Sequence, residues 1–134
     1  MKYRMLLAIL PAVILIACAG LGRRETDAQA LARHMDYAGE PVEKFTYLGH
    51  LNGWRALGRD RVLVYTGVND AYLLTVAPPC NDLQFAQTIA LTSTGHTVSR
   101  RFDSVLVGDQ RCMITEIRPV DYRQMRQAAK EAGV

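Results

Sequence analysis

The sequence lacks the short motifs by which common enzyme sites are recognised. It contains no HExxH, HxxxH or CxxC spacing, no GxSxG frame and no glycine-rich phosphate loop. The three histidines, His34, His50 and His96, stand far apart, and the carboxylates are scattered singly. These absences argue against a zinc site, a common serine hydrolase, a paired-carboxylate glycosidase and a nucleotide-binding loop. We therefore predict no catalytic residues, no metal site and no cofactor.

An excess of charge of one sign is also missing. The chain has 16 basic and 13 acidic residues, and Lys2 and Arg4 fall in an export signal, which leaves 14 against 13. This balance gives no case for nucleic-acid binding. Some arginines gather locally and could face anionic lipid or peptidoglycan, but a solvated sheet face with acidic neighbours is the favoured interpretation. These arginines are Arg55, Arg59, Arg61, Arg100 and Arg101.

No apolar run reaches the roughly 20 residues that a helix needs to cross a bilayer. The apolar run at residues 5–17 has thirteen residues and follows Lys2 and Arg4, a pattern typical of a signal peptide. It ends in Leu15-Ile16-Ala17-Cys18, which matches the bacterial lipobox of an aliphatic, a variable and a small residue followed by cysteine. Cys18 supplies the thiolate that can take a diacylglycerol. We predict a signal peptide at residues 1–17 and lipid on Cys18.

Lipidation predicts a protein of the bacterial cell envelope, held in a membrane by two or three acyl chains, because one chain holds only marginally. Ala19 follows the cysteine at a position where aspartate favours inner-membrane retention in Gram-negative bacteria. We therefore expect the outer membrane, with the protein facing the periplasm. A plain signal peptide cut near residues 17–19, or a membrane-spanning anchor, stays open as an alternative.

The segment after Cys18 predicts a spacer. Residues 20–39 are polar and alanine-rich, and a flexible chain of that length spans about 25 Å. Thr26 or Asp27 could instead cap a helix running to Ala38, with Leu31 and Met35 on one face. Both interpretations stay open. We take residues 18–39 as the lipidated N-terminus and tether, and 40–134 as a β-rich domain with a C-terminal helix.

From Pro41 the pattern changes to short β-type runs. Strands are expected at residues 44–51, 54–57, 61–66, 71–76, 88–92, 97–102, 104–107 and 111–117. Asn52-Gly53 predicts a two-residue hairpin between the first two, and Pro119 predicts the end of the last. Asp121, with Gln124 three residues later, predicts a capped helix. The expected fold is mainly β (α+β): a small antiparallel β-roll, partial barrel or sandwich with one C-terminal helix.

Two cysteines remain for the domain, Cys80 and Cys112. Because an exported protein enters an oxidising compartment, the economical prediction is a disulfide between them. The alternative is a functional role for these cysteines, as a catalytic thiol or as ligands of a metal site.

Aromatic residues gather in the first strands, at Phe45, Tyr47, Trp54, Tyr65 and Tyr72. Such residues more often form a core or cross-strand pairs. The alternative is a ligand groove lined by Tyr47, Trp54, Tyr65 and Tyr72.

Several phrases resemble a family of small bacterial envelope proteins that is classed only as a domain of unknown function. They are Gly39-Glu40-Pro41-Val42, Phe45-Thr46-Tyr47, Asn52-Gly53-Trp54, residues 71–76 and Ile117-Arg118-Pro119-Val120-Asp121. The resemblance covers roughly residues 39–125 and includes both internal cysteines. It implies a lipoprotein or secreted β-rich domain, and it brings no activity, substrate or catalytic residue.

The leading functional hypothesis is a non-enzymatic envelope lipoprotein that binds or supports an envelope protein or lipid. A second hypothesis is a periplasmic module that binds a small ligand or a lipid in the aromatic groove. The third is a cryptic hydrolase that uses His50 or His96.

Overall fold

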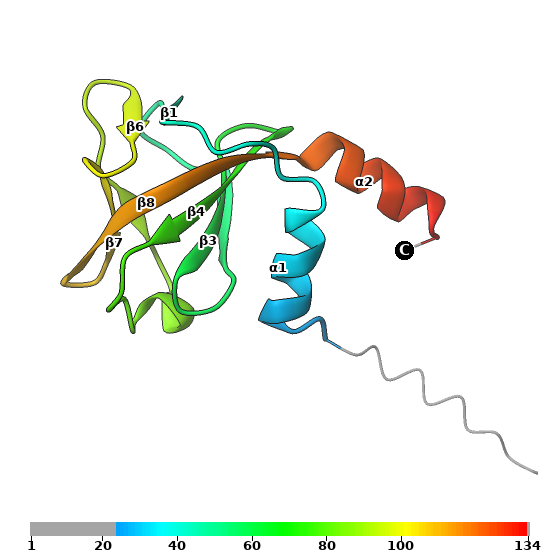
Figure 1. Cartoon of the computed structure of the whole chain (residues 1–134), viewed down its shortest axis with the longest axis horizontal. Helices are drawn as coiled ribbons and strands as arrows, with labels where there is room; N and C mark the ends of the chain where they lie inside the picture. The colour runs from blue at the N-terminus through cyan, green and yellow to red at the C-terminus, as the bar shows by residue number, and fades with distance from the viewer. Residues whose placement is uncertain (1–23, 134) are drawn as a thin grey trace, which may run out of the picture.

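The structure is a computed structural model of the chain, and it describes residues 24–133. The expected signal peptide and Cys18 lie outside the described residues. Figure 1 shows a curled sheet with one helix beside it and a second leaving its end. The strands are β1 Lys44–Thr46, β2 Gly53–Ala56, β3 Arg61–Tyr65, β4 Asp70–Val76, β5 Ala90–Leu91, β6 Thr97–Ser99, β7 Ser104–Val107 and β8 Gln110–Asp121. The helices are α1 Asp27–Met35, the short 3-10 helix η1 Leu83–Phe85, and α2 Tyr122–Glu131.

Six strands form one antiparallel sheet in the order β2-β3-β4-β8-β7-β5, and β1 pairs with β6 in a second, small sheet. The long strand β8 joins two parts of the fold, because its first residues pair with β7 and its later residues with β4. The register shifts between Thr75 and Val76, where β8 carries one extra residue. Such a bulge bends a strand and increases its twist. The result is a curled half-barrel with a C-terminal helix, as the sequence predicts.

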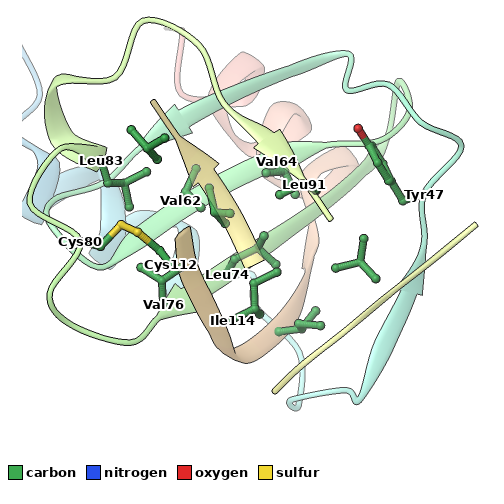
Figure 2. Packing of buried hydrophobic residues seen from close by; sticks show 14 of the residues in the cluster. Tyr47, Val62, Val64, Leu74, Val76, Cys80, Leu83, Leu91, Cys112 and Ile114 are labelled. Carbon is green, nitrogen blue, oxygen red and sulfur yellow. A yellow bond between two sulfur atoms is a disulfide. The ribbon is translucent and has the colours of Figure 1, made fainter. Parts of the chain in front are cut away.

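The inside of the half-barrel holds the main core. Its fully buried side chains include Val62, Val64, Leu74, Val76, Ile114 and Ile117. They alternate along β3 and β4, as the period of two in a strand requires. In β8 the extra residue of the bulge places Ile114 and Ile117 three positions apart. Figure 2 shows the Cys80–Cys112 disulfide at one end of this core and Tyr47 at the opposite end.

The outer face of the sheet is covered as well, which explains why β3 and β4 are apolar almost without interruption. Leu63, Leu73 and Val120 face away from the main core and pack in a second cluster with Ala30 of α1. Thr26 and Gln29 form a capping box that starts α1. Its buried side chains are Ala30 and His34. Of the residues expected on the apolar face, Leu31 packs partly buried against the same cluster, whereas Met35 is exposed.

This packing places residues 27–38 in the folded unit. The sequence left open whether they form a flexible tether or a helix. They form α1 and a turn whose backbone bonds to the end of β8, because the Asp121 N–H donates to the Tyr37 carbonyl (2.8 Å). The folded unit therefore begins near Thr26, well before residue 40.

The prediction of a hairpin at Asn52-Gly53 is wrong. Strand β1 pairs with β6, and β2 pairs with β3. Asn52 comes directly before β2, which Gly53 starts, and the Asn52 N–H donates to the Tyr65 carbonyl (2.7 Å). The hairpin instead joins β2 to β3 through residues 58–60, where Gly58 has a φ of +107° that an L side chain rarely adopts.

The prediction that Pro119 ends the last strand is also wrong, because β8 continues to Asp121. Proline is disfavoured in a sheet because it lacks the N–H of the ladder. Pro119 lies opposite Tyr72 of β4, while Arg118 and Val120 lie in register with Leu73 and Ala71. The other side of Pro119 faces residues 38–42, which use only its carbonyl, through a bond from the Gly39 N–H (2.8 Å). No strand neighbour therefore needs the missing donor.

Strand β6 ends at Ser99, three residues earlier than expected, because the buried Asp103 turns the chain. The Asp103 carboxylate accepts hydrogen bonds from the Ser99 N–H (2.7 Å) and the Thr92 hydroxyl (2.8 Å). Arg101, in the turn, has a φ of +68°. These bonds replace the ladder that a longer strand would form. Strands β1 and β5 are likewise shorter than expected.

Candidate functional site

The expected disulfide between Cys80 and Cys112 is present. It ties the loop after Pro79 to β8, and both cysteines are buried in the main core. A cystine with no exposed sulfur is a structural crosslink, so these two residues contribute no reactive thiol. The other predicted site residue of this type, Cys18, lies outside the described residues.

The four aromatic residues of the expected groove do not line one cavity. Tyr47 is buried in the main core. Tyr72 stacks on Phe45 on the same, inner side of the sheet, with ring centroids 4.4 Å apart. Tyr65 lies on the outer side, packed against the second cluster. The sheet itself therefore separates Tyr65 from Tyr47 and Tyr72.

Trp54 and Tyr65 nevertheless both border one shallow cavity of about 420 Å³ at the start of β2. We call it the aromatic depression. Trp54 lies opposite Val64 and packs against the main core, so its ring lies on the inner face and the Tyr65 ring on the outer face. Its lining residues are Asn52, Gly53, Trp54, Tyr65, Gly67, Val68, Tyr122 and Arg126. Two of the four predicted aromatic residues thus contribute to a surface site, together with residues from α2.

The aromatic depression is held in shape by contacts between β3 and α2. Tyr122, the first residue of α2, meets Tyr65 edge-to-face with ring centroids 4.9 Å apart. Arg126 lies one helical turn later, with its guanidinium 5.1 Å from the centroid of the Tyr122 ring, and it donates a hydrogen bond to the Asn69 side chain. This stack presents a cation over an aromatic face, an attractive arrangement.

Gly53 and Tyr65 define the floor of the depression. A Cβ atom at Gly53 would lie 3.4 Å from Cδ2 of Tyr65, so the absence of a side chain leaves the tyrosine ring uncovered on that side. Burial, and then the neighbouring Tyr122, raise the pKa of Tyr65 to about 12. The Tyr65 phenol is therefore protonated and neutral at physiological pH.

A family model described as a family of unknown function, DUF6491, matches residues 1–134. The chain belongs to this family. This match is longer than residues 39–125, the region whose short sequence segments resemble such a family. No curated protein and no solved structure matches the chain. Membership in DUF6491 assigns no activity.

Sequence reasoning missed Tyr122 and Arg126 as members of the site in this DUF6491 chain. It placed both on the C-terminal helix, which is present and capped by Asp121, whose side chain accepts a hydrogen bond from the Gln124 N–H (2.9 Å). The signal that could have found them is their spacing, because residues i and i+4 share one helix face. What the spacing could not give is the strand against which that face packs.

A second concave surface lies between the two helices of the DUF6491 domain. This groove of about 530 Å³ is lined mainly by Met125 and the alanines of α2 on one side, and by Glu25, Arg33 and Tyr37 on the other. Glu25 accepts two hydrogen bonds from Arg33 (2.7 and 2.9 Å) and one from Arg55 (3.3 Å). The bonds from Arg33 are the main cause that lowers the pKa of Glu25.

The arginines that gathered in the sequence are partly paired in the structure. Arg55 bonds Glu25, Arg61 donates to the Thr75 hydroxyl (2.8 Å), and Arg100 bonds Glu43 through two contacts of 2.6 and 2.7 Å. Arg59 and Arg101 are exposed. The acidic partners are Glu25 and Glu43, which come from distant parts of the sequence.

The described part of the DUF6491 chain, residues 24–133, contains no group of three or more His, Cys, Asp or Glu side chains that could hold a metal ion. Over the same residues, no helix is long and apolar enough to cross a membrane. His50 and His96 are exposed. Of the histidine rings in that range, His34 is the one with a hydrogen bond, to the Ala30 carbonyl. We find no observation that favours the hydrolase hypothesis.

His34 is a polar residue inside the α1–sheet interface and is only 2% exposed. Its Nδ1 atom lies 2.6 Å from the Ala30 carbonyl oxygen, so the neutral ring donates its proton there. Burial lowers the pKa of His34, and the nearby Arg33 and Arg55 lower it further, against the raising effects of the Ala30 carbonyl and Glu25. The folded domain therefore holds His34 in its neutral form.

We expect the free energy of unfolding to decrease as the pH falls below about 6.5, the ordinary pKa of histidine. In that range the unfolded chain binds a proton at His34, whereas the folded domain, with its lowered pKa, does not, so protons favour unfolding. The loss continues until the pH reaches the lowered pKa. Urea unfolding of the wild type and of His34→Gln between about pH 5 and 8 measures it. Equal pH dependence of the two proteins would contradict this role of His34.

Proposed function

We propose that the chain is an exported bacterial lipoprotein, held by acyl chains on Cys18 at the periplasmic face of the outer membrane, whose domain binds another envelope component without catalysing a reaction. One observation carries the proposal: a short basic start, an uncharged apolar run and the sequence Leu15-Ile16-Ala17-Cys18 follow one another without a gap. Each of these features has a separate role in export and lipidation.

The start of α1 supports a position close to the membrane. Only residues 19–25 separate Cys18 from the capping residue Thr26. Seven residues extend at most about 25 Å, so a lipid on Cys18 would hold the domain within that distance of the headgroups. The partner of such a domain is therefore another component at or near the same membrane surface.

The aromatic depression is the surface that we assign to this partner. Interfaces are enriched in tyrosine and arginine, and the depression presents Tyr65, Tyr122 and Arg126 together. Val68 stands at its rim with 72% of its surface exposed. An exposed aliphatic side chain beside partly covered aromatic rings is a suitable border for a binding site.

Site-specific photocrosslinking in the producing bacterium tests this assignment. A photoreactive phenylalanine analogue at Val68 is expected to give a covalent adduct with a defined envelope component, identified by mass spectrometry. Arg126→Glu in the same protein is expected to suppress the adduct by reversing the charge of the depression. The matched control carries the analogue at Phe102, which is 85% exposed on the turn between β6 and β7. Absence of an adduct at 68, or the same adduct at 102, would refute the assignment.

A further inference from the structure

We propose that the free edge of β2, together with the aromatic depression, binds an extended acidic peptide segment of a partner protein as an added antiparallel strand. The inference rests on the proposed binding function and names the class of partner. Its two parts are an edge with unused backbone groups and a pattern of side-chain sites beside it.

The backbone of β2 offers hydrogen-bonding groups on its outer edge. The Leu57 N–H donates to the carbonyl of Arg61 (2.8 Å), and the register that pairs Ala56 with Val62 would, one step further, place Arg61 opposite Leu57. Because such bonded pairs alternate along an antiparallel ladder, Arg55 and Gly53 also face β3 with their backbone groups, whereas those of Trp54 and Ala56 point outward. β2 is the first strand of the sheet, and no other segment of the described chain bonds these outward groups. The edge is a template for one more strand.

The edge and the aromatic depression are continuous. Gly53 and Trp54 belong to both. In an added strand, the residue opposite Gly53 shares the outer face of the sheet with Gly53. Its side chain would therefore enter the depression beside Tyr65, in the space that the missing Gly53 side chain leaves. This position favours an apolar or aromatic residue.

Two residues away, the added strand meets Arg55 on the same face. Arg55 makes one contact of 3.3 Å with Glu25, and that carboxylate already takes two shorter bonds from Arg33. The Arg55 guanidinium therefore retains donors for a second carboxylate. Arg126 adds positive charge at the other end of the depression. The site thus fits an extended segment with the order acidic, any residue, aromatic.

The same chemistry disfavours a second copy of this chain as the occupant. The antiparallel register that bonds both outward residues of one β2 to both of another places Trp54 opposite Ala56 of the other copy. The two Arg55 residues would then lie directly opposite each other. Like charges in that position destabilise a strand pair. A partner with a carboxylate at this point removes the repulsion and adds an attraction.

The test uses the oxidised domain and a fluorescent, end-capped peptide, Thr-Thr-Glu-Thr-Phe-Thr-Ser, with binding measured by fluorescence anisotropy. Ala56→Pro removes one outward N–H but leaves the bonds to β3, because proline is tolerated at a strand edge. We expect it to weaken binding about tenfold, as the loss of a backbone hydrogen bond implies. The matched variant Ala56→Ser keeps the donor and should bind within about twofold of the wild type.

Modified peptides test the same point without altering the protein, in case Ala56→Pro does not fold. N-methylation of the threonine between glutamate and phenylalanine blocks the N–H that would face Trp54, and should abolish binding. N-methylation of the phenylalanine, whose N–H would point away from β2, should be tolerated. Equal affinity for the two methylated peptides, or for a peptide with lysine in place of glutamate, would overturn strand addition. Strand addition by a peptide would also be overturned if the wild type formed a stable dimer in sedimentation and Ala56→Pro dissociated that dimer.

The crosslink from position 68 separates this inference from the proposed function. Loss of the adduct in both Arg126→Glu and Ala56→Pro supports strand addition. Loss in Arg126→Glu alone overturns strand addition and leaves the depression as a binding site. If the analogue at position 68 gives no adduct in a domain that carries neither variant, the proposed binding function is itself refuted.

Discussion

Replacing Cys18 with serine is expected to abolish lipid attachment and to release the domain from the membrane fraction. The reason is chemical: a serine hydroxyl cannot replace a cysteine thiolate as the nucleophile that forms the thioether. A single acyl chain binds membranes only with an association constant of about 10⁴ M⁻¹, and two or three are needed for stable anchoring. Metabolic labelling with a palmitate analogue and the intact mass of the purified protein measure the attachment, and fractionation measures the release.

The neighbouring position gives the matched control. Ala19→Asp changes the residue after the cysteine but keeps the thiol, so we expect it to retain the label and to move to the inner membrane of a Gram-negative host. Cys18→Ser should lose both label and sedimentation. A wild-type protein without label and without acyl mass would reject lipidation and favour a plain signal peptide instead. Label on the serine variant would place the lipid elsewhere.

Features that depend on neighbouring residues could be read from the sequence. The tight turn at Gly108-Asp109 joins β7 to β8, and Gly108 has the positive φ (+56°) that makes glycine the favoured residue there. Asp121 caps α2 three residues before Gln124. The pairing of Cys80 with Cys112 could be predicted from the number of cysteines in the domain and from the oxidising compartment expected for an exported protein. The turn and the helix cap depend on contacts within a few residues. For the disulfide, two cysteines allow only one pairing.

Features that depend on partner choice could not be read in this way. Asn52-Gly53 has the composition of a hairpin turn, but β1 is taken by β6, which lies 51 or more residues further along the chain. Proline is typical of a strand end. The neighbouring segment, residues 38–42, however, forms a hydrogen bond only with the carbonyl of Pro119, so the missing N–H is not needed. Local propensity was overridden by tertiary pairing at both places.

The candidate site shows the same limit. The expected groove required Tyr65 and Tyr72 on one surface. The register of β3 with β4 pairs Val64 with Tyr72 and Tyr65 with Ala71, which sends the two tyrosines to opposite faces. Tyr65 instead meets Tyr122, the first residue of α2, because β8 runs directly into that helix. No spacing in the sequence fixes that register or the direction of α2.

Removing the disulfide is expected to lower the free energy of unfolding by about 3–4 kcal/mol. The bond closes a loop with a sequence separation of 32, and in the chain-entropy model the open loop adds that much freedom to the unfolded state. A small domain has about 5–15 kcal/mol in total, so the loss is a large fraction. Urea unfolding of the oxidised wild type, the reduced wild type and the double variant Cys80→Ala, Cys112→Ala measures it.

Alanine is the better replacement because both cysteines are buried in the main core, where a serine hydroxyl would need a hydrogen-bond partner. The double variant should unfold at the same urea concentration with and without reductant. The wild type should shift toward it only when reduced. A reduced wild type as stable as the oxidised one would show that the loop gains no freedom when opened.

The effect of reduction should be greatest in the segment that the bond closes. Between Val76 and Ser104, the described chain makes few ladder contacts: η1 has three residues, β5 pairs with β7 through two residue pairs, and β6 pairs with β1 through three. Leu83 is fully buried in the main core and holds this segment by packing. Hydrogen exchange of the reduced domain is therefore expected to rise first around η1 and β5, while the amides shared by β4 and β8 stay protected. An equal rise in exchange across the whole sheet would contradict this. It would show that the disulfide stabilises the domain only against global unfolding.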